Sequence, residues 1–259
     1  MLNTMEKSEI YKIKIFKTGE ALIPAPEAYW MSNFHESLKI SFHAILAYND
    51  KTNFLINTGL PEDLEERNEQ MRKFYGKRAE FKKEKSTDTL LSEYGFKPED
   101  IRNVSFTPIQ DYTTGQLDIF KNARLFINRK GWIQDIIAPE MPKHSSRNLF
   151  IPDKILKYIL FSSWKNVILF DSNDITELIP GMYSLWTGCH HRSSTAFIVN
   201  TEKGSIIFTD SAFKKRNIEE DLPIGIAENI FECHSAYSKL KKYGTILPLY
   251  DPEIDDLIL

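Results

Sequence analysis

The first third of the chain carries apolar runs that are typical of β-strands. Residues 38–48 are rich in β-branched and aromatic side chains, and the polar residues 49–52 separate them from a second apolar run at 53–57. Two such runs joined by a short polar turn predict a β-hairpin. The dipeptide Thr58-Gly59 then marks the end of the second strand.

The remaining pattern alternates strands with helices. Short apolar runs rich in β formers predict strands at 103–107, 124–128, 166–170, 182–187, 195–201, 205–209 and 245–248. Apolar residues spaced as on a helix face, with Gly or Pro near the ends, predict helices at 86–95, 152–161 and 227–243. Residues 62–84 are highly charged and predict a helix or loop on the surface, and residues 135–150 predict a polar loop that could cover a pocket.

No repeat of fixed period and no low-complexity linker divides the chain. We therefore expect residues 1–259 to form a single α/β domain with its helices on the outside.

Charge and composition restrict the classes of partner. The formal net charge is -3, and the most basic stretch, residues 72–85, is diluted by Glu80 and Glu84. That stretch is typical of a solvated helix face, so no nucleic-acid partner is expected. No apolar run approaches the roughly 20 residues of a membrane span, and residues 1–17 lack the apolar core of a signal peptide. We expect a cytoplasmic protein without a membrane partner, and a homo-oligomer stays an open alternative.

The two cysteines, Cys189 and Cys233, fit a reducing compartment, where disulfides are rare. We expect Cys189 to be a buried, inert thiol.

Five short segments occur in an order that resembles one protein family. They are FLINTGLP at 54–61, GFKPEDIRNV at 95–104, GCHHRSS at 188–194, IIFTD at 206–210 and ILPLYDP at 246–252. Together they resemble the metallo-β-lactamase superfamily, and most closely its N-acyl-homoserine-lactonase-like branch. The resemblance covers roughly residues 40–252. It implies a four-layer αβ/βα sandwich and hydrolysis of an ester, lactone or amide by a hydroxide held between two zinc-type ions.

The family's central motif, His-x-His-x-Asp-His, is replaced in this chain by TPIQDYTTG at residues 107–115. The alignment puts other residue types at six positions of the family site: Asn57, Pro108, Gln110, Tyr112, Thr113 and Tyr250. Only His190 and Asp210 match the family's ligands.

That ligand count limits the metal chemistry. A zinc site normally uses three or four strong protein ligands, and His190 and Asp210 supply two. We therefore expect no dinuclear centre and at most one Zn or similar divalent ion, held by His190, Asp210 and one of Gln110, Tyr250 or His191. A tyrosine would bind well only after losing a proton whose pKa is about 10.

The resemblance assigns provisional roles to the residues of this site. His190, Asp210, Tyr112 and Tyr250 are the candidate catalytic residues. The candidate substrate-binding residues are Gln110, Thr113, His191 and Arg192. Alternatives stay open: Arg192 can be the ion-pair partner of Asp210, the loop around His190 can be purely structural, and the two tyrosines can simply fill volume left by absent ligands.

Three functions follow, in order of preference. The first is a lactonase-like hydrolase that acts on a small-molecule ester, lactone or related carbonyl at an altered, metal-poor site. The second is a metal-independent lyase or isomerase that uses His190 and the tyrosines for proton transfer. The third is a non-catalytic member that binds a small molecule, since one fold hosts many functions.

Overall fold

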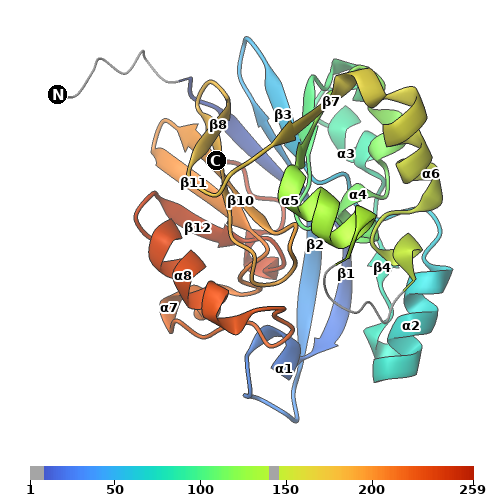
Figure 1. Cartoon of the computed structure of the whole chain (residues 1–259), viewed down its shortest axis with the longest axis vertical. Helices are drawn as coiled ribbons and strands as arrows, with labels where there is room; N and C mark the ends of the chain where they lie inside the picture. Colours follow the sequence, from blue (N-terminus) through green and yellow to red (C-terminus); the bar gives the residue numbers. More distant parts are fainter. Residues whose placement is uncertain (1–8, 140–145) are drawn as a thin grey trace.

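Two β-sheets form the centre of the molecule, and helices cover their outer faces (Figure 1). The structure is a computed structural model that describes residues 9–139 and 146–259. The larger sheet has the strand order β4-β1-β2-β3-β5-β6-β7, and the smaller sheet has the order β12-β11-β10-β9-β8. This arrangement confirms the predicted αβ/βα sandwich.

The strands have the following bounds. Those of the larger sheet are β1 Lys12–Pro24, β2 Ser37–Tyr48, β3 Asn53–Ile56, β4 Lys82–Lys83, β5 Asn103–Ser105, β6 Arg124–Asn128 and β7 Val167–Phe170. Those of the smaller sheet are β8 Thr176–Ile179, β9 Met182–Trp186, β10 Thr195–Thr201, β11 Gly204–Thr209 and β12 Thr245–Pro248.

The α-helices are α1 Ala25–Ala28, α2 Glu65–Tyr75, α3 Thr87–Ser92, α4 Asp111–Thr114, α5 Arg129–Gly131, α6 Asp153–Lys157, α7 Lys215–Glu219 and α8 Ile230–Leu240. Two π-helical turns, Trp132–Ile137 and Tyr158–Ser162, extend α5 and α6. Among the described residues, no helix combines the length and the apolar character that a membrane crossing requires.

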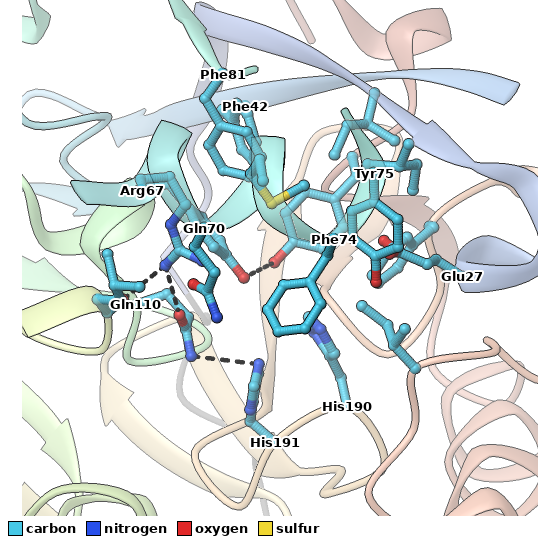
Figure 2. Close-up of a pocket in the computed structure, with 18 of the residues that line it drawn as sticks. Glu27, Phe42, Arg67, Gln70, Phe74, Tyr75, Phe81, Gln110, His190 and His191 are labelled. Atoms are coloured by element: carbon cyan, nitrogen blue, oxygen red, sulfur yellow. Dashed lines mark hydrogen bonds between the residues drawn. The ribbon is translucent and has the colours of Figure 1, made fainter. Parts of the chain in front are cut away.

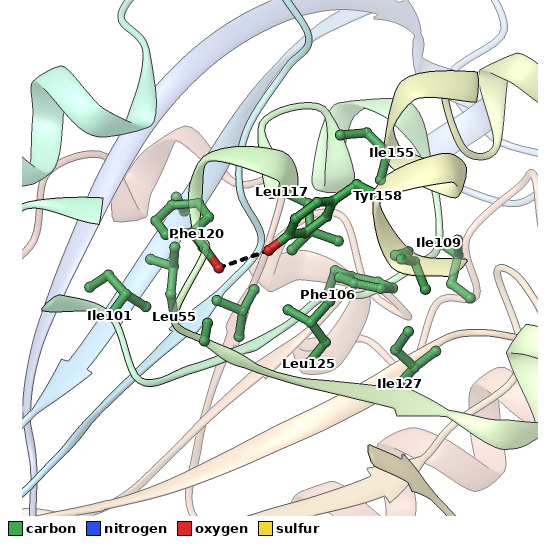
Figure 3. Packing of buried hydrophobic residues seen from close by; sticks show 14 of the residues in the cluster. Leu55, Ile101, Phe106, Ile109, Leu117, Phe120, Leu125, Ile127, Ile155 and Tyr158 are labelled. Carbon is green, nitrogen blue, oxygen red and sulfur yellow. Dashed lines mark hydrogen bonds between the residues drawn. The ribbon is translucent and has the colours of Figure 1, made fainter. Parts of the chain in front are cut away.

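Three layers of apolar side chains hold the sandwich together. Between the sheets, side chains of β1, β2 and β3 pack against Phe197 and Val199 of β10 and Phe208 of β11. On the outer face of the larger sheet, Leu55 and Leu125 pack against helices α3 and α6, and Figure 3 shows this cluster. On the smaller sheet, Leu240 of α8 packs against β9, β10 and β11.

Most predicted elements are present, with one large omission. The hairpin is confirmed, because β2 and β3 pair antiparallel. Strand β1, which pairs with β2 along twelve positions, was not predicted. Its polar residues break the alternation that marks a strand: Lys14 and Thr18 are buried, and the Lys14 ammonium donates to the Asp256 carbonyl oxygen at 2.9 Å. Part of the predicted 135–150 loop, residues 140–145, lies outside the described residues.

Candidate functional site

Loops from both sheets meet at one edge of the sandwich, where Thr107 joins them. Thr107 follows β5, and its backbone N–H donates to the Asn57 side-chain oxygen at 2.9 Å. Its hydroxyl donates to Asp210 Oδ1, just after β11, at 2.8 Å. The same hydroxyl accepts from the backbone N–H of Thr195, at the start of β10, at 2.8 Å. Two of the segments that carry the family resemblance, 54–61 and 206–210, are therefore linked through Thr107.

His190 and Asp210 form a buried pair at this edge. The His190 Nδ1 atom lies 3.1 Å from Asp210 Oδ2, and Asp210 is completely buried. The hydroxyls of Thr107 and Ser194 also donate to the two oxygens of Asp210. Because the carboxylate accepts, the Nδ1 atom of His190 carries the ring proton, and Nε2 has the lone pair.

His190 lines a cavity of about 300 Å³, and because its Nδ1 atom is bonded to the buried Asp210, Nε2 is the ring nitrogen that is left for a ligand. Figure 2 shows His190 and His191 at one wall of this cavity and the aromatic rings of Phe42 and Phe81 on another. Most of the lining is apolar, including Ile23, Ile40, Met71, Leu149, Phe213 and Ile226. A concave, largely apolar cavity with a few polar groups is typical of a small-molecule site.

Tyr112 and Tyr250 contribute the hydroxyl groups of the cavity. Their hydroxyl oxygens lie 3.5 Å apart, and the Tyr250 ring stands edge-on to the His190 ring at 6.1 Å between centroids. Burial raises the pKa of both phenols well above the usual value, and the negative charge of Asp210 adds to the increase. Both tyrosines therefore stay protonated and can donate hydrogen bonds to a ligand.

Arg67 of helix α2 orients Gln110 and, through it, His191. The Arg67 guanidinium donates to both oxygens of Asp111, at 2.6 and 3.1 Å, and to Gln110 Oε1 at 3.1 Å. The Gln110 side-chain nitrogen must then donate to His191 Nε2, which lies 3.3 Å away. As a result, the proton of a neutral His191 ring sits on Nδ1, which is 3.5 Å from a carboxylate oxygen of Glu228.

Two predicted binding residues, Arg192 and Thr113, do not line the cavity. Arg192 pairs with Glu228 and Glu232 at distances between 2.6 and 3.1 Å, because its side chain extends toward helix α8 and away from Asp210. The hydroxyl of Thr113 donates to the backbone carbonyls of Pro108 and Gln110 and is therefore already satisfied. Asp210 itself lies behind His190 and has no exposed surface.

The two cysteines are not free thiols, which corrects the expectation of a reduced pair. Cys189 and Cys233 form a disulfide that joins the loop before His190 to helix α8. Both residues are completely buried, and their Cα atoms lie 5.1 Å apart. The cytoplasmic location, which rested in part on these cysteines, stays a prediction, as do the oligomeric state and the absence of a nucleic-acid partner.

The residues of this edge do not fit a divalent metal ion between His190 and Asp210. Their facing atoms share a hydrogen bond, and hydroxyls already donate to both carboxylate oxygens. The phenols of Tyr112 and Tyr250 hold their protons too firmly to act as ligands.

A second set of potential ligands lies beside this pair. Among the described residues, Asp135, His191 and Glu228 place possible ligand atoms within 4.8 Å of one another. The Nδ1 atom that His191 would offer carries a proton when Gln110 donates to Nε2. A divalent ion held by this group would therefore have to displace that proton.

Sequence reasoning missed two charged residues of the cavity, Arg67 and Glu27. Arg67 lies in the charged segment assigned to the surface, and Glu27 lies in a region for which no element was predicted. A single charged residue in such a segment gives no signal of its own, because only the fold shows that it faces a cavity.

Comparisons with known proteins give a consistent result. No family model matches the chain. The N-acyl homoserine lactonase of Bacillus cereus is 23% identical over 201 residues, which cover 74% of this chain and 71% of the lactonase.

Two solved structures extend the likeness to the fold. An N-acyl homoserine lactone hydrolase with the product N-hexanoyl-L-homoserine at its catalytic metal centre superposes with a TM-score of 0.74, at 17% identity and 94% coverage of both chains. A probable metal-dependent hydrolase from Staphylococcus aureus superposes with a TM-score of 0.73, at 16% identity, covering 95% of this chain and 91% of the other. The chain thus has the metallo-β-lactamase fold, and its neighbours in sequence and in structure include N-acyl homoserine lactonases.

Proposed function

We propose that this protein is a metal-independent hydrolase of a small-molecule lactone or ester. The observation that carries the proposal is the buried His190–Asp210 pair, whose free Nε2 atom faces a largely apolar cavity beside two protonated tyrosines. The relatives act on lactones, as their names state, and this supports the carbonyl class of substrate.

The residues divide the chemistry between proton transfer and charge stabilisation. His190 Nε2 takes a proton from a water molecule as the water oxygen bonds to the carbonyl carbon, and Asp210 stabilises the imidazolium that forms. The hydroxyls of Tyr112 and Tyr250 donate hydrogen bonds to the negative oxygen that develops. When the carbon–oxygen bond of the ester or lactone breaks, the imidazolium returns its proton to the leaving oxygen. A lactone then gives a hydroxy acid, and an open ester gives a carboxylic acid and an alcohol.

Turnover of a panel of short-chain lactones and esters tests the proposal. The variant His190→Ala should lose about 10²- to 10⁴-fold in kcat, as is usual for removal of a general base. The matched control is His43→Gln, since His43 is a buried histidine paired with Asp255 at 2.8 Å outside the cavity. We expect this control to keep the wild-type rate.

Two outcomes would contradict the proposal. If His190→Ala is as active as the wild type, the proposal that His190 transfers the proton is wrong. If the wild type turns over no member of the panel, the proposed hydrolase function is wrong. The alternatives are then a lyase, an isomerase or a non-catalytic binding protein.

A further inference from the structure

One wall of the cavity carries a carboxyl group that the proposed hydrolysis does not use. Glu27 of helix α1 lines the cavity beside Phe74 and Tyr75, the last residues of helix α2. Figure 2 shows these three side chains on the side of the cavity away from Arg67. Among the described residues, no lysine, arginine or histidine forms an ion pair with Glu27, and its polar neighbour is the Tyr75 hydroxyl.

The backbone around Glu27 is firmly held. Its carbonyl oxygen accepts from the N–H groups of Gly225 and Ile226 at 2.7 and 3.2 Å. A Cβ atom on Gly225 would lie 1.5 Å from the Pro26 carbonyl oxygen, so only glycine permits this close approach. The backbone from which the Glu27 side chain extends is therefore fixed.

An isolated carboxyl in apolar surroundings calls for a positive partner. Burial raises the pKa of Glu27, and the hydrogen bond from Tyr75 opposes that rise only in part. A cation that enters beside it would stabilise the ionised form and so lower the pKa of the carboxyl. The rings of Phe74 and Tyr75 add to this preference, because aromatic faces attract ammonium groups.

The other ionisable groups discussed for this cavity, Arg67 and His190, neither bind such a cation nor pair with Glu27. Arg67 is balanced by Asp111, to which it donates twice. Burial and the neighbouring His191 lower the pKa of His190, so that ring stays neutral over a wider pH range. Glu27 is thus the acidic residue of the cavity lining, and no cationic side chain of the described residues pairs with it.

We propose that Glu27, Phe74 and Tyr75 bind an ammonium group of the substrate while the reacting carbonyl lies at His190. This inference rests on the proposed hydrolysis and names its substrate class, an amino-substituted lactone or ester of small size. The ammonium contributes charge-assisted hydrogen bonds to the Glu27 carboxylate, and the apolar lining contacts the connecting carbon chain.

Calorimetric binding of three six-carbon probes tests the ammonium site without any chemical step. The probes are hexylammonium, 1-hexanol and hexanoate, which differ in charge but have similar chains. The wild type should bind hexylammonium at least about tenfold more tightly than either other probe. The variant Glu27→Gln should lose that preference, whereas Glu36→Gln, at an exposed glutamate bonded to Asn33, should keep it. Equal affinity for the three probes in the wild type, or an unchanged preference in Glu27→Gln, would overturn the inference.

The pH dependence gives a second readout. Between about pH 4 and pH 8, hexylammonium and Arg67 keep their positive charge, and the cavity tyrosines stay protonated and neutral. Its affinity should rise as Glu27 ionises, and Tyr75→Phe should move the midpoint to higher pH because the bond from Tyr75 lowers the Glu27 pKa. The same titration in His190→Gln and His191→Gln separates the contribution of these two rings. A pH profile that Glu27→Gln leaves unchanged would count against the assignment.

Failure of this inference and failure of the proposed hydrolysis give different results. If plain lactones are hydrolysed in a His190-dependent way but hexylammonium shows no preference, only the ammonium site is wrong. If hexylammonium binds through Glu27 but no ester or lactone is hydrolysed, only the hydrolysis is wrong. Thermal unfolding of each variant confirms that the comparison uses folded protein.

Discussion

The pKa of His190 is set by influences of opposite sign. Burial and the neighbouring His191 lower it, whereas the hydrogen bond to Asp210 raises it, and the net direction is downward. A histidine with a lowered pKa stays neutral, and therefore basic, at pH values where an exposed histidine is already protonated. The proposed base should thus keep working in mildly acidic solution.

This direction predicts the shape of the pH profile. The acid limb of kcat/KM should have its midpoint below about 6.5, the usual histidine value. His191→Gln removes the neighbouring ring that lowers the pKa of His190, so the midpoint should move upward. His234→Gln, at an exposed position on α8, is the control and should leave it in place. An acid limb above 6.5 in the wild type would show that another group titrates.

Phenylalanine substitutions separate the two interpretations of the tyrosines. If the hydroxyls stabilise the negative oxygen, Tyr112→Phe and Tyr250→Phe should each lower kcat by about 10²- to 10³-fold with little change in KM. If the rings only fill volume, both variants should match the wild type, because phenylalanine preserves the packing. Steady-state kinetics of the single and double variants decide between these cases.

At the residue level, the sequence located the pair His190 and Asp210 but not the groups around it. Those two residues carry a motif signal, since each follows a strand in the order that the family resemblance implies. Arg67 and Glu27 carry no such signal, because a charged residue on a short helix looks the same whether it faces solvent or a cavity. Their roles depend on contacts with segments distant in the sequence, such as Arg67 with Asp111.

At the level of elements, helix α8 positions the loop that carries His190. The disulfide ties Cys189 to Cys233 of α8, and the carboxylate of Glu232 accepts from the Cys189 backbone N–H at 3.0 Å. Arg192, two residues beyond His190, pairs with the same glutamate. The loop is therefore held by its connections to α8 on both sides of His190.

Breaking the disulfide should loosen this attachment. Cys233→Ser opens a connection between residues 44 apart in sequence, so the free energy of unfolding should fall by about 2–4 kcal/mol. Denaturant unfolding measures this change. Reductant should destabilise the wild type by a similar amount and leave Cys233→Ser unaffected. Equal stability of the wild type and the variant under non-reducing conditions would show that the bond contributes nothing.

Strand β1 shows why some elements escaped prediction. Its buried lysine, Lys14, is paired with the backbone of Asp256 and lies over the Tyr94 ring, so a polar residue stands where the pattern calls for an apolar one. Helix α8, by contrast, was predicted from apolar residues at helical spacing and from Gly244 near its end. Two of those residues, Tyr237 and Leu240, are buried in the structure. Local patterns therefore identified elements such as α8, whose apolar spacing is regular, and missed β1, whose polar residues have distant partners.

On the scale of the whole molecule, the site is where the edges of two sheets meet. Five short segments in a fixed order were enough to predict the sandwich, because the order of strands determines which loops share an edge. The sequence did not predict what those loops do with their side chains. Asp210, a ligand position in the resemblance, instead accepts hydrogen bonds from Thr107 and Ser194 and holds His190.

Asp210 accepts hydrogen bonds at a position where the resemblance implies a metal ligand, so we predict that catalysis does not need a divalent metal. Protein dialysed against a strong chelator should keep its kcat on any lactone or ester substrate, and elemental analysis should find no stoichiometric zinc, iron or manganese in the active sample. The physical reason is that a metal ion between His190 and Asp210 would have to displace the Nδ1 proton of His190 and two hydroxyl donors at once. An ion on the free Nε2 atom would not have Asp210 as a ligand, and a zinc site normally uses three or four strong protein ligands. Loss of activity on chelation, with recovery on adding zinc, would contradict this prediction. In that event the same experiment on His191→Gln would show whether the metal sits among Asp135, His191 and Glu228 or at His190.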